Sequence, residues 1–128
     1  MRILLDTHVL LWSIMQSTRI DGNARTAIES TENEVFFSAA NVWEIAIKTQ
    51  AQRLRLPISP EDLARAARAA GFAELPIDSE AAGRVATLPM HHRDPFDRIL
   101  IAQAMAMPAR LFTVDKKLVP YSDLITLI

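Results

Sequence analysis

The chain has 128 residues, 14 basic and 15 acidic side chains, and no cysteine. Without cysteine there is no thiol nucleophile, cysteine-ligated zinc or iron–sulfur cluster, and nothing marks an oxidising compartment, so we expect a cytoplasmic protein. The net charge of −1 excludes a wholly cationic surface that holds nucleic acid by counterion release, so any contact with nucleic acid should be local.

The length suits a single domain over residues 1–128 with one ordinary hydrophobic core. The apolar run at the N-terminus is too short for a signal peptide. No stretch reaches the roughly 20 apolar residues of a membrane helix, so no membrane contact is expected. No internal repeat or low-complexity tract divides the chain.

Strands and helices alternate along the first half of the chain. Apolar strand formers predict strands over residues 2–5 and 34–38. Wide apolar faces or turn signals predict helices over residues 9–15, 24–30 and 39–52. Each strand therefore leads into a helix.

The second half continues in the same way. Ser59 and Asp94 each precede a proline and an acidic side chain in the way that N-cap residues do, and both predict helix starts. The expected elements are helices from 59 to 70, from 79 to about 88 and from 94 to before 108, strands at 72–77, 110–114 and 123–128, and a short helical or turn segment at 116–121. This alternation predicts an α/β fold, a three-layer α/β/α sandwich around a mainly parallel sheet of four to five strands.

Acidic side chains stand where the expected strands end and the next helices begin. Asp6 and Asp115 each follow a strand, Glu44 lies in the helix after the second strand, and Asp94 or Asp97 opens a late helix. In a parallel sheet these positions share one edge, outside the carboxyl ends of the strands, where such folds bind their ligands. We therefore expect the carboxylates to converge.

Converging carboxylates repel one another unless a cation offsets their charge. Mg²⁺ or Mn²⁺ suits such a site because both ions prefer oxygen ligands, and a bound ion that activates water suits phosphodiester hydrolysis. Two other hypotheses remain open at this point. The acids are helix caps in an inert binding module, or Asp6 is a phosphoryl-accepting nucleophile, which the absence of an acid two residues later disfavours.

Several polar residues near this edge are candidates for supporting roles. Thr7 and Ser38 are placed either to donate hydrogen bonds to a carboxylate or phosphate or to cap helices. The basic side chains that are candidates to hold an RNA backbone are Lys48, Arg93, Arg98 and Lys116. The histidines at positions 8, 91 and 92 do not form a recognised metal-binding spacing, so we interpret all three as ordinary polar contacts, with His8 near enough to Asp6 to support it.

Four segments resemble the PIN-domain ribonucleases, and within them the VapC-like toxins of type II toxin–antitoxin modules, in the branch often paired with Phd/YefM-type antitoxins. The segments follow one another at matching spacings over nearly the whole chain: LLDTH at 4–8, SAANVWEIAIK at 38–48, DPFDRILIAQA at 94–104 and FTVD at 112–115.

The resemblance implies that Asp6, Glu44, Asp97 and Asp115 form the acidic metal site of this family, with Asp94 as the N-cap that presents Asp97. It also implies a PIN-like fold and an endoribonuclease that depends on Mg²⁺ or Mn²⁺ and leaves a 5′-phosphate. The expected partners are an RNA substrate, a cognate antitoxin that covers the site, and a second copy of the chain in a homodimer.

Overall fold

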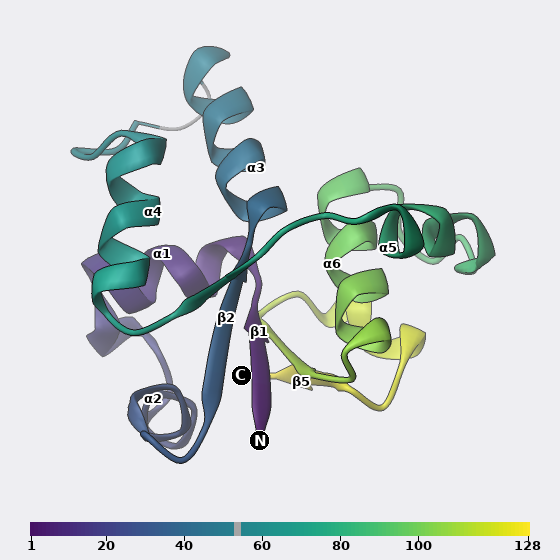
Figure 1. Ribbon diagram of the computed structural model, residues 1–128, viewed down its shortest axis with the longest axis horizontal. Coiled ribbons are helices and arrows are strands. Elements are labelled where there is room, and N and C mark those ends of the chain that lie inside the picture. The colour runs from purple at the N-terminus through teal and green to yellow at the C-terminus, as the bar shows by residue number, and fades with distance from the viewer. Residues whose placement is uncertain (53–54) are drawn as a thin grey trace.

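The computed structural model describes residues 1–52 and 55–128, and its strands form one central sheet (Figure 1). The strands are β1 (Arg2–Leu5), β2 (Glu34–Ser38), β3 (Ala73–Leu75), β4 (Arg110–Thr113) and β5 (Ile125–Leu127). They lie in the order β3-β2-β1-β4-β5, and each neighbouring pair is parallel. The expected α/β fold is confirmed, with all five strands described here parallel.

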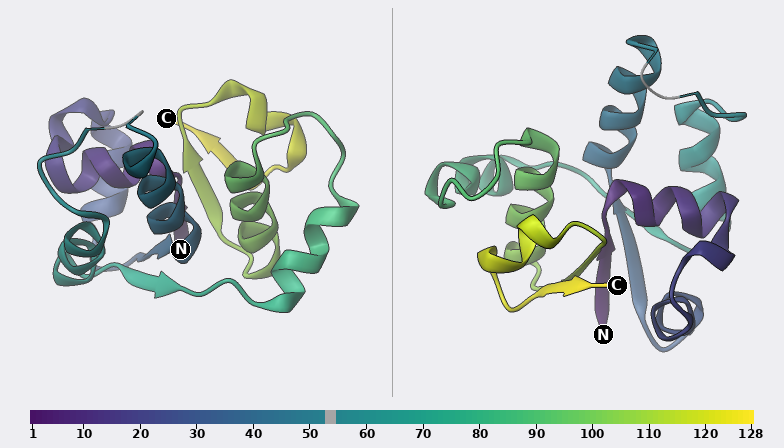
Figure 2. Two further views of the ribbon diagram at one scale, coloured as in Figure 1. Left: turned by 90° about the horizontal axis from the view of Figure 1, so that it is seen from above. Right: turned by 180° about the vertical axis from the view of Figure 1, so that it is seen from behind.

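Helices cover both faces of this sheet, as the three views show (Figures 1 and 2). They are α1 (Thr7–Met15), α2 (Gly22–Glu29), α3 (Ala39–Gln50), α4 (Pro60–Ala69), α5 (Ser79–Arg84) and α6 (Pro95–Ala106), with 3-10 turns at Ser17–Arg19, Val85–Thr87 and Lys116–Tyr121. Within the described ranges, none of the helices has the length and apolar character needed to cross a membrane.

The central strand β1 is apolar on both faces, which is why it lies between two helical layers. Leu4 packs with Leu100 of α6 and the α5 side of the sheet, whereas Ile3 and Leu5 pack with the layer of α1, α2 and α4. These three side chains are fully buried, whereas Arg2 at the start of β1 is exposed. This alternation within a doubly covered strand is typical of parallel α/β sheets.

The order of the strands creates a crevice next to β1. The chain passes from β1 to β2 and β3 on one side, and then returns to place β4 and β5 on the other side. The connections after β1 and β4 therefore leave in opposite directions, and ligands of such sheets bind at this point. Asp6 follows β1 and Asp115 lies just beyond β4, so the two acids meet at this crevice.

Two predicted helix ends were wrong. The helix predicted from residue 79 to about 88 ends at Arg84 and continues as a 3-10 turn over Val85–Thr87. The buried guanidinium of Arg98 donates hydrogen bonds to the carbonyl oxygens of Val85 and Leu88 in this segment. The helix predicted to residue 52 ends at Gln50, and Gln52 adopts a left-handed backbone conformation with φ of 59°.

Candidate metal centre

The four acids predicted from the sequence line one cleft of about 400 Å³ at the carboxyl ends of the strands. They come from the residue after β1, from α3, from the first turn of α6 and from the connection after β4. The lining residues are Asp6, Thr7, His8, Glu44, Lys48, His92, Asp94, Asp97, Val114 and Asp115. The sheet topology thus brings together residues that lie up to 109 positions apart.

Asp6 is fixed at the crevice by hydrogen bonds to both carboxylate oxygens. Its Oδ1 accepts from the backbone N–H of Val9 at 3.0 Å, so Asp6 is the N-cap of α1. Its Oδ2 accepts from the Thr113 hydroxyl at the end of β4. Burial raises the pKa of Asp6 above its usual value of 3.8, and the Thr113 and Val9 hydrogen bonds act in the opposite direction. Asp6 therefore both caps α1 and lines the cleft.

Glu44 reaches the cleft from α3 and is only 4% exposed. The Thr7 hydroxyl donates to its Oε1 at 2.5 Å, and Lys48, one helical turn later, forms an ion pair with its Oε2. The Asn41 amide in turn donates to the Thr7 oxygen at 3.0 Å. A buried carboxylate needs such partners, and this network sets the direction in which Glu44 points.

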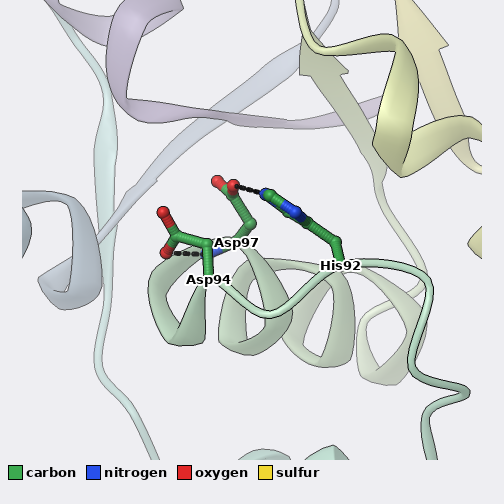
Figure 3. Close-up of side chains that lie close together, drawn as sticks. All are labelled: His92, Asp94 and Asp97. Atoms are coloured by element: carbon green, nitrogen blue, oxygen red, sulfur yellow. Dashed lines mark hydrogen bonds and ion pairs between the residues drawn. The ribbon is translucent and has the colours of Figure 1, made fainter.

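The first turn of α6 and the segment just before it place three more polar side chains at the cleft (Figure 3). Asp94 Oδ1 accepts from the N–H groups of Phe96 at 2.8 Å and Asp97 at 3.3 Å, so Asp94 is the N-cap of α6. His92 Nε2 lies 2.9 Å from Asp97 Oδ2. One ligand atom from each of His92, Asp94 and Asp97 lies within 4.8 Å of the others, close enough to share a metal ion.

The pKa of Asp97 is raised to about 7. The largest cause is burial, followed by the nearby charge of Asp94, while the His92 hydrogen bond lowers the pKa and the charges of Glu44 and Asp6 raise it further. Each added negative charge makes the next one harder to form. The cleft is therefore short of positive charge.

Asp115 closes the cleft from the β4 side. Its Oδ1 caps the following 3-10 turn by accepting from Lys117 N–H at 2.9 Å. Its Oδ2 lies 3.7 Å from His92 Nε2, so the same imidazole faces both Asp97 and Asp115. This contact links the last two acids of the sequence pattern.

Of the two roles predicted for Ser38 the structure shows helix capping, it contradicts the RNA contact expected of Arg98, and it places the polar contact of His92 at the cleft. Ser38 is fully buried, caps α3 and donates to Gln103 Oε1 at 2.6 Å, away from the cleft. Arg98 is only 6% exposed and binds carbonyl oxygens, so it does not offer its charge to RNA. His92, interpreted from sequence as an ordinary polar contact, lies inside the cleft.

Arg93 and Lys116 are exposed outside the cleft, whereas Lys48 lines it. Lys48 also borders a second groove of about 380 Å³, which shares Thr7 and His8 with the cleft. The lining of this groove also includes Arg19 and Arg55. The Arg19 guanidinium lies 4.5 Å from the centre of the Trp12 ring. None of the lining residues that the structure describes for this groove is acidic.

The residues of the cleft fit a hard divalent cation. Five carboxylates line it, and the cationic or potentially cationic side chains among its described lining residues are Lys48, His8 and His92. Carboxylate oxygens are suitable ligands for Mg²⁺ or Mn²⁺. The raised pKa of Asp97 has the direction expected where such a charge is needed.

Comparison with known proteins agrees with this architecture. The chain is 32% identical over 120 residues to "Ribonuclease VapC22" of Mycobacterium tuberculosis (strain ATCC 25618 / H37Rv), covering 91% of this chain and 88% of that protein. Its fold is similar to VapBC2 from Rickettsia felis bound to a DNA fragment from their promoter, with a TM-score of 0.69, 13% identity, and coverage of 100% of this chain and 98% of that one. It is also similar to FitAcB from Neisseria gonorrhoeae, with a TM-score of 0.55, 20% identity, and coverage of 90% and 88%.

A family model described as "PIN domain" matches residues 3–123. This range contains all five acids that line the cleft and, apart from Arg2 at the start of β1, every described strand except β5. The chain therefore belongs to the PIN domain family.

Proposed function

We propose that this protein is a metal-dependent endoribonuclease that acts as the toxin of a toxin–antitoxin pair. It cleaves RNA phosphodiester bonds with water activated by Mg²⁺ or Mn²⁺ and leaves a 5′-phosphate. The observation that carries this proposal is the convergence of Asp6, Glu44, Asp97 and Asp115 on one cleft. The 32% identity to "Ribonuclease VapC22" over most of both chains supports the choice of reaction.

In this proposal Asp6, Asp97 and Asp115 supply carboxylate oxygens to the cation, and Glu44 completes the acidic wall. When bound, a divalent cation supplies Lewis-acid activation of water and neutralises charge on the phosphate. Thr113 and Thr7 keep the Asp6 and Glu44 carboxylates from rotating, because each hydroxyl donates to one of their oxygens. Fixed ligand directions are what a catalytic metal site needs from its surroundings.

The groove beside the cleft suits the RNA backbone. Arg19, Lys48 and Arg55 provide positive charge there, and the shared residues Thr7 and His8 make the groove continuous with the cleft. Contacts to phosphates position a nucleic acid without reading its sequence. We infer that an RNA strand entering the cleft passes along this groove.

Two protein partners complete the proposal. The similarity to VapC22 and the VapC-like motifs support a cognate antitoxin that covers the cleft. The same resemblance supports a homodimer, for which light scattering of the purified chain should give about twice its mass of 14.3 kDa. Coexpression with the cognate antitoxin should restore growth of cells that the chain alone arrests.

RNA cleavage tests the reaction directly. Antitoxin-free protein is incubated with 5′-labelled structured RNAs in EDTA, Mg²⁺ or Mn²⁺, together with the variants Asp6→Asn and Asp97→Asn. Asp62→Asn is the matched control, since Asp62 is an exposed acid paired with Arg65 on α4. We expect discrete cuts in wild type and control only when metal is present, and a loss of at least 100-fold in the two cleft variants. Undiminished cleavage by either cleft variant would refute the proposal.

A further inference from the structure

We propose that His92 is a positioning residue of the metal centre, held by a clamp of Arg98 and Tyr121, and that its imidazole orients the carboxylates of Asp97 and Asp115. This inference rests on the proposed function, because it assigns His92 a task at the same cleft. His92 does not belong to the acidic pattern that the sequence predicts.

The His92 ring stands between two elements that approach each other only in the folded chain. Its Nε2 lies 2.9 Å from Asp97 Oδ2 in α6 and 3.7 Å from Asp115 Oδ2 after β4. An ionised carboxylate only accepts hydrogen bonds, so Nε2–H of the imidazole is the donor whenever Asp97 is ionised, as it is when it holds a cation. Its side chain is 19% exposed, and Asp97 is 20% exposed, so water competes little for this hydrogen bond.

The backbone of His92 is held at both of its polar groups. The Tyr121 hydroxyl accepts from His92 N–H at 2.7 Å and donates to the His92 carbonyl oxygen at 3.2 Å. Arg98 Nη1 donates to the same carbonyl at 3.3 Å and to the Tyr121 oxygen at 3.2 Å. A tyrosine hydroxyl has one donor and two acceptor positions, and all three are used here.

Arg98 extends this clamp to the segment before His92. Its guanidinium also donates to the carbonyl oxygens of Val85 at 3.0 Å, Leu88 at 3.3 Å and Pro89 at 2.9 Å. Residues 88–94 form neither helix nor strand, so these hydrogen bonds replace a regular backbone ladder. Because Asp97 and Arg98 are consecutive in α6, Asp97 faces the cleft while Arg98 fixes the segment that delivers the imidazole to it.

The neighbouring histidine provides the contrast. His91 is exposed, is absent from the cleft lining, and packs edge-on against the Tyr121 ring with 5.0 Å between ring centres. Residues that hydrogen-bond to metal ligands without touching the metal typically contribute 10–100-fold to metal affinity or activity. We therefore expect that substitution of His92 weakens metal binding strongly and that substitution of His91 leaves it unchanged.

Titration calorimetry with Mn²⁺ on EDTA-treated full-length chain tests the proposal. His92→Phe should weaken Mn²⁺ binding by about 10–100-fold. His92→Gln should stay within a few-fold of wild type, because its amide N–H replaces the Nε2 donor. His91→Phe, which keeps the aromatic contact with Tyr121, should bind like wild type. With saturating Mn²⁺ and the RNA concentration varied, His92→Phe should lower kcat and leave KM for RNA unchanged.

A second variant covers the case in which His92→Phe does not fold. Tyr121→Phe keeps the ring and removes only the clamping hydroxyl, so it should also weaken Mn²⁺ binding, though less than His92→Phe. Wild-type affinity in His92→Phe or in Tyr121→Phe would overturn the inference and leave the proposed function intact. Equal losses of Mn²⁺ affinity in His92→Gln and His92→Phe would also overturn the inference. Failure of the wild-type chain to bind Mn²⁺ would overturn the proposed function as well.

Discussion

Asp97 shows, at the scale of a single residue, that an ionised acid in the metal-free cleft lowers the stability of the fold. Its pKa of about 7 in the folded chain lies well above its usual value of 3.8, chiefly because of burial and the charge of Asp94. The folded state therefore binds a proton that the unfolded state has already released between these two pH values. Stability from this residue is present below about pH 4 and is lost as the pH rises towards 7.

Asp97→Asn should accordingly stabilise the metal-free chain, since the amide keeps the shape and carries no charge. We expect a gain of about 4 kcal/mol in the free energy of unfolding at pH 8, and a smaller gain at pH 5. Urea unfolding in EDTA at the two pH values measures both. Asp62→Asn controls for removing an acid elsewhere. A loss of stability at pH 8, or a gain that does not grow with pH, would contradict this account of Asp97.

The acids of the site were predictable residue by residue, whereas His92 was not. Asp6 and Asp115 follow strand ends, Asp97 lies in the first turn of α6, and Glu44 lies in the second turn of α3, and the carboxyl ends of parallel strands meet at one sheet edge. Position left Asp94 and Asp97 as alternatives, and the resemblance to the PIN-domain ribonucleases selected Asp97. The position of His92 depends on the Tyr121 hydroxyl, 29 residues later in the chain. A contact of that kind leaves no periodic signal in the sequence.

At the scale of elements, the start of α3 is tied to the middle of α6. The Ser38 hydroxyl caps α3 and donates to Gln103 Oε1 at 2.6 Å, and Gln103 Nε2 donates to the Pro76 carbonyl at 3.2 Å. Asn41 completes the capping box by accepting from Ser38 N–H at 2.7 Å. These buried hydrogen bonds fix the two helices that carry Glu44 and Asp97.

Ser38→Ala should therefore lower the free energy of unfolding by more than the loss of an ordinary N-cap does. Loss of a cap costs about 1 kcal/mol, and leaving Gln103 Oε1 buried without its donor adds about 1–3 kcal/mol. Ser59→Ala is the matched variant, because Ser59 caps α4 at an exposed position by accepting from Asp62 N–H. Chemical denaturation compares the two. Equal losses of stability would show that the buried Ser38–Gln103 hydrogen bond contributes nothing.

Most element positions followed from the sequence, because caps and apolar patterns are local. Asp94 with Pro95 fixed the start of α6, and the apolar run at residues 2–5 predicted β1. The end of α5 did not follow, because the chain tightens into a 3-10 turn at Val85–Thr87, and Arg98, 13 residues after Val85, binds the Val85 carbonyl oxygen. Hydrogen bonds from distant side chains are what local patterns miss.

On the scale of the whole molecule, a net charge of −1 conceals two surfaces of opposite character. The cleft is lined by five carboxylates, and the adjoining groove carries Arg19, Lys48 and Arg55. This arrangement lets a nearly neutral chain attract phosphates at one place and a cation at another. The total charge alone predicted only that such contacts would be local.

The double variant Arg19→Ala/Arg55→Ala should weaken RNA binding while leaving Mn²⁺ affinity unchanged. If each guanidinium contacts one phosphate of a single strand, the slope of log affinity against log salt should become shallower by about 1.4 in total. Fluorescence anisotropy at several salt concentrations measures this slope. Arg110→Ala is the control, as Arg110 begins β4 at the opposite end of the strand from the cleft. An unchanged slope in the double variant would place the RNA elsewhere.

The most direct measurement of the central claim, that four distant acids form one metal site, is thermal unfolding of the EDTA-treated chain with added Mn²⁺ or Mg²⁺. A cation that binds only the folded state should stabilise it by about 2.7 kcal/mol at 100 times its dissociation constant. For a domain of this length that corresponds to an increase in Tm of about 10 °C. The account predicts this increase in wild type and in Asp62→Asn, and its loss in both Asp6→Asn and Asp97→Asn. A wild-type Tm that does not respond to millimolar metal, or an undiminished response in the cleft variants, would contradict it.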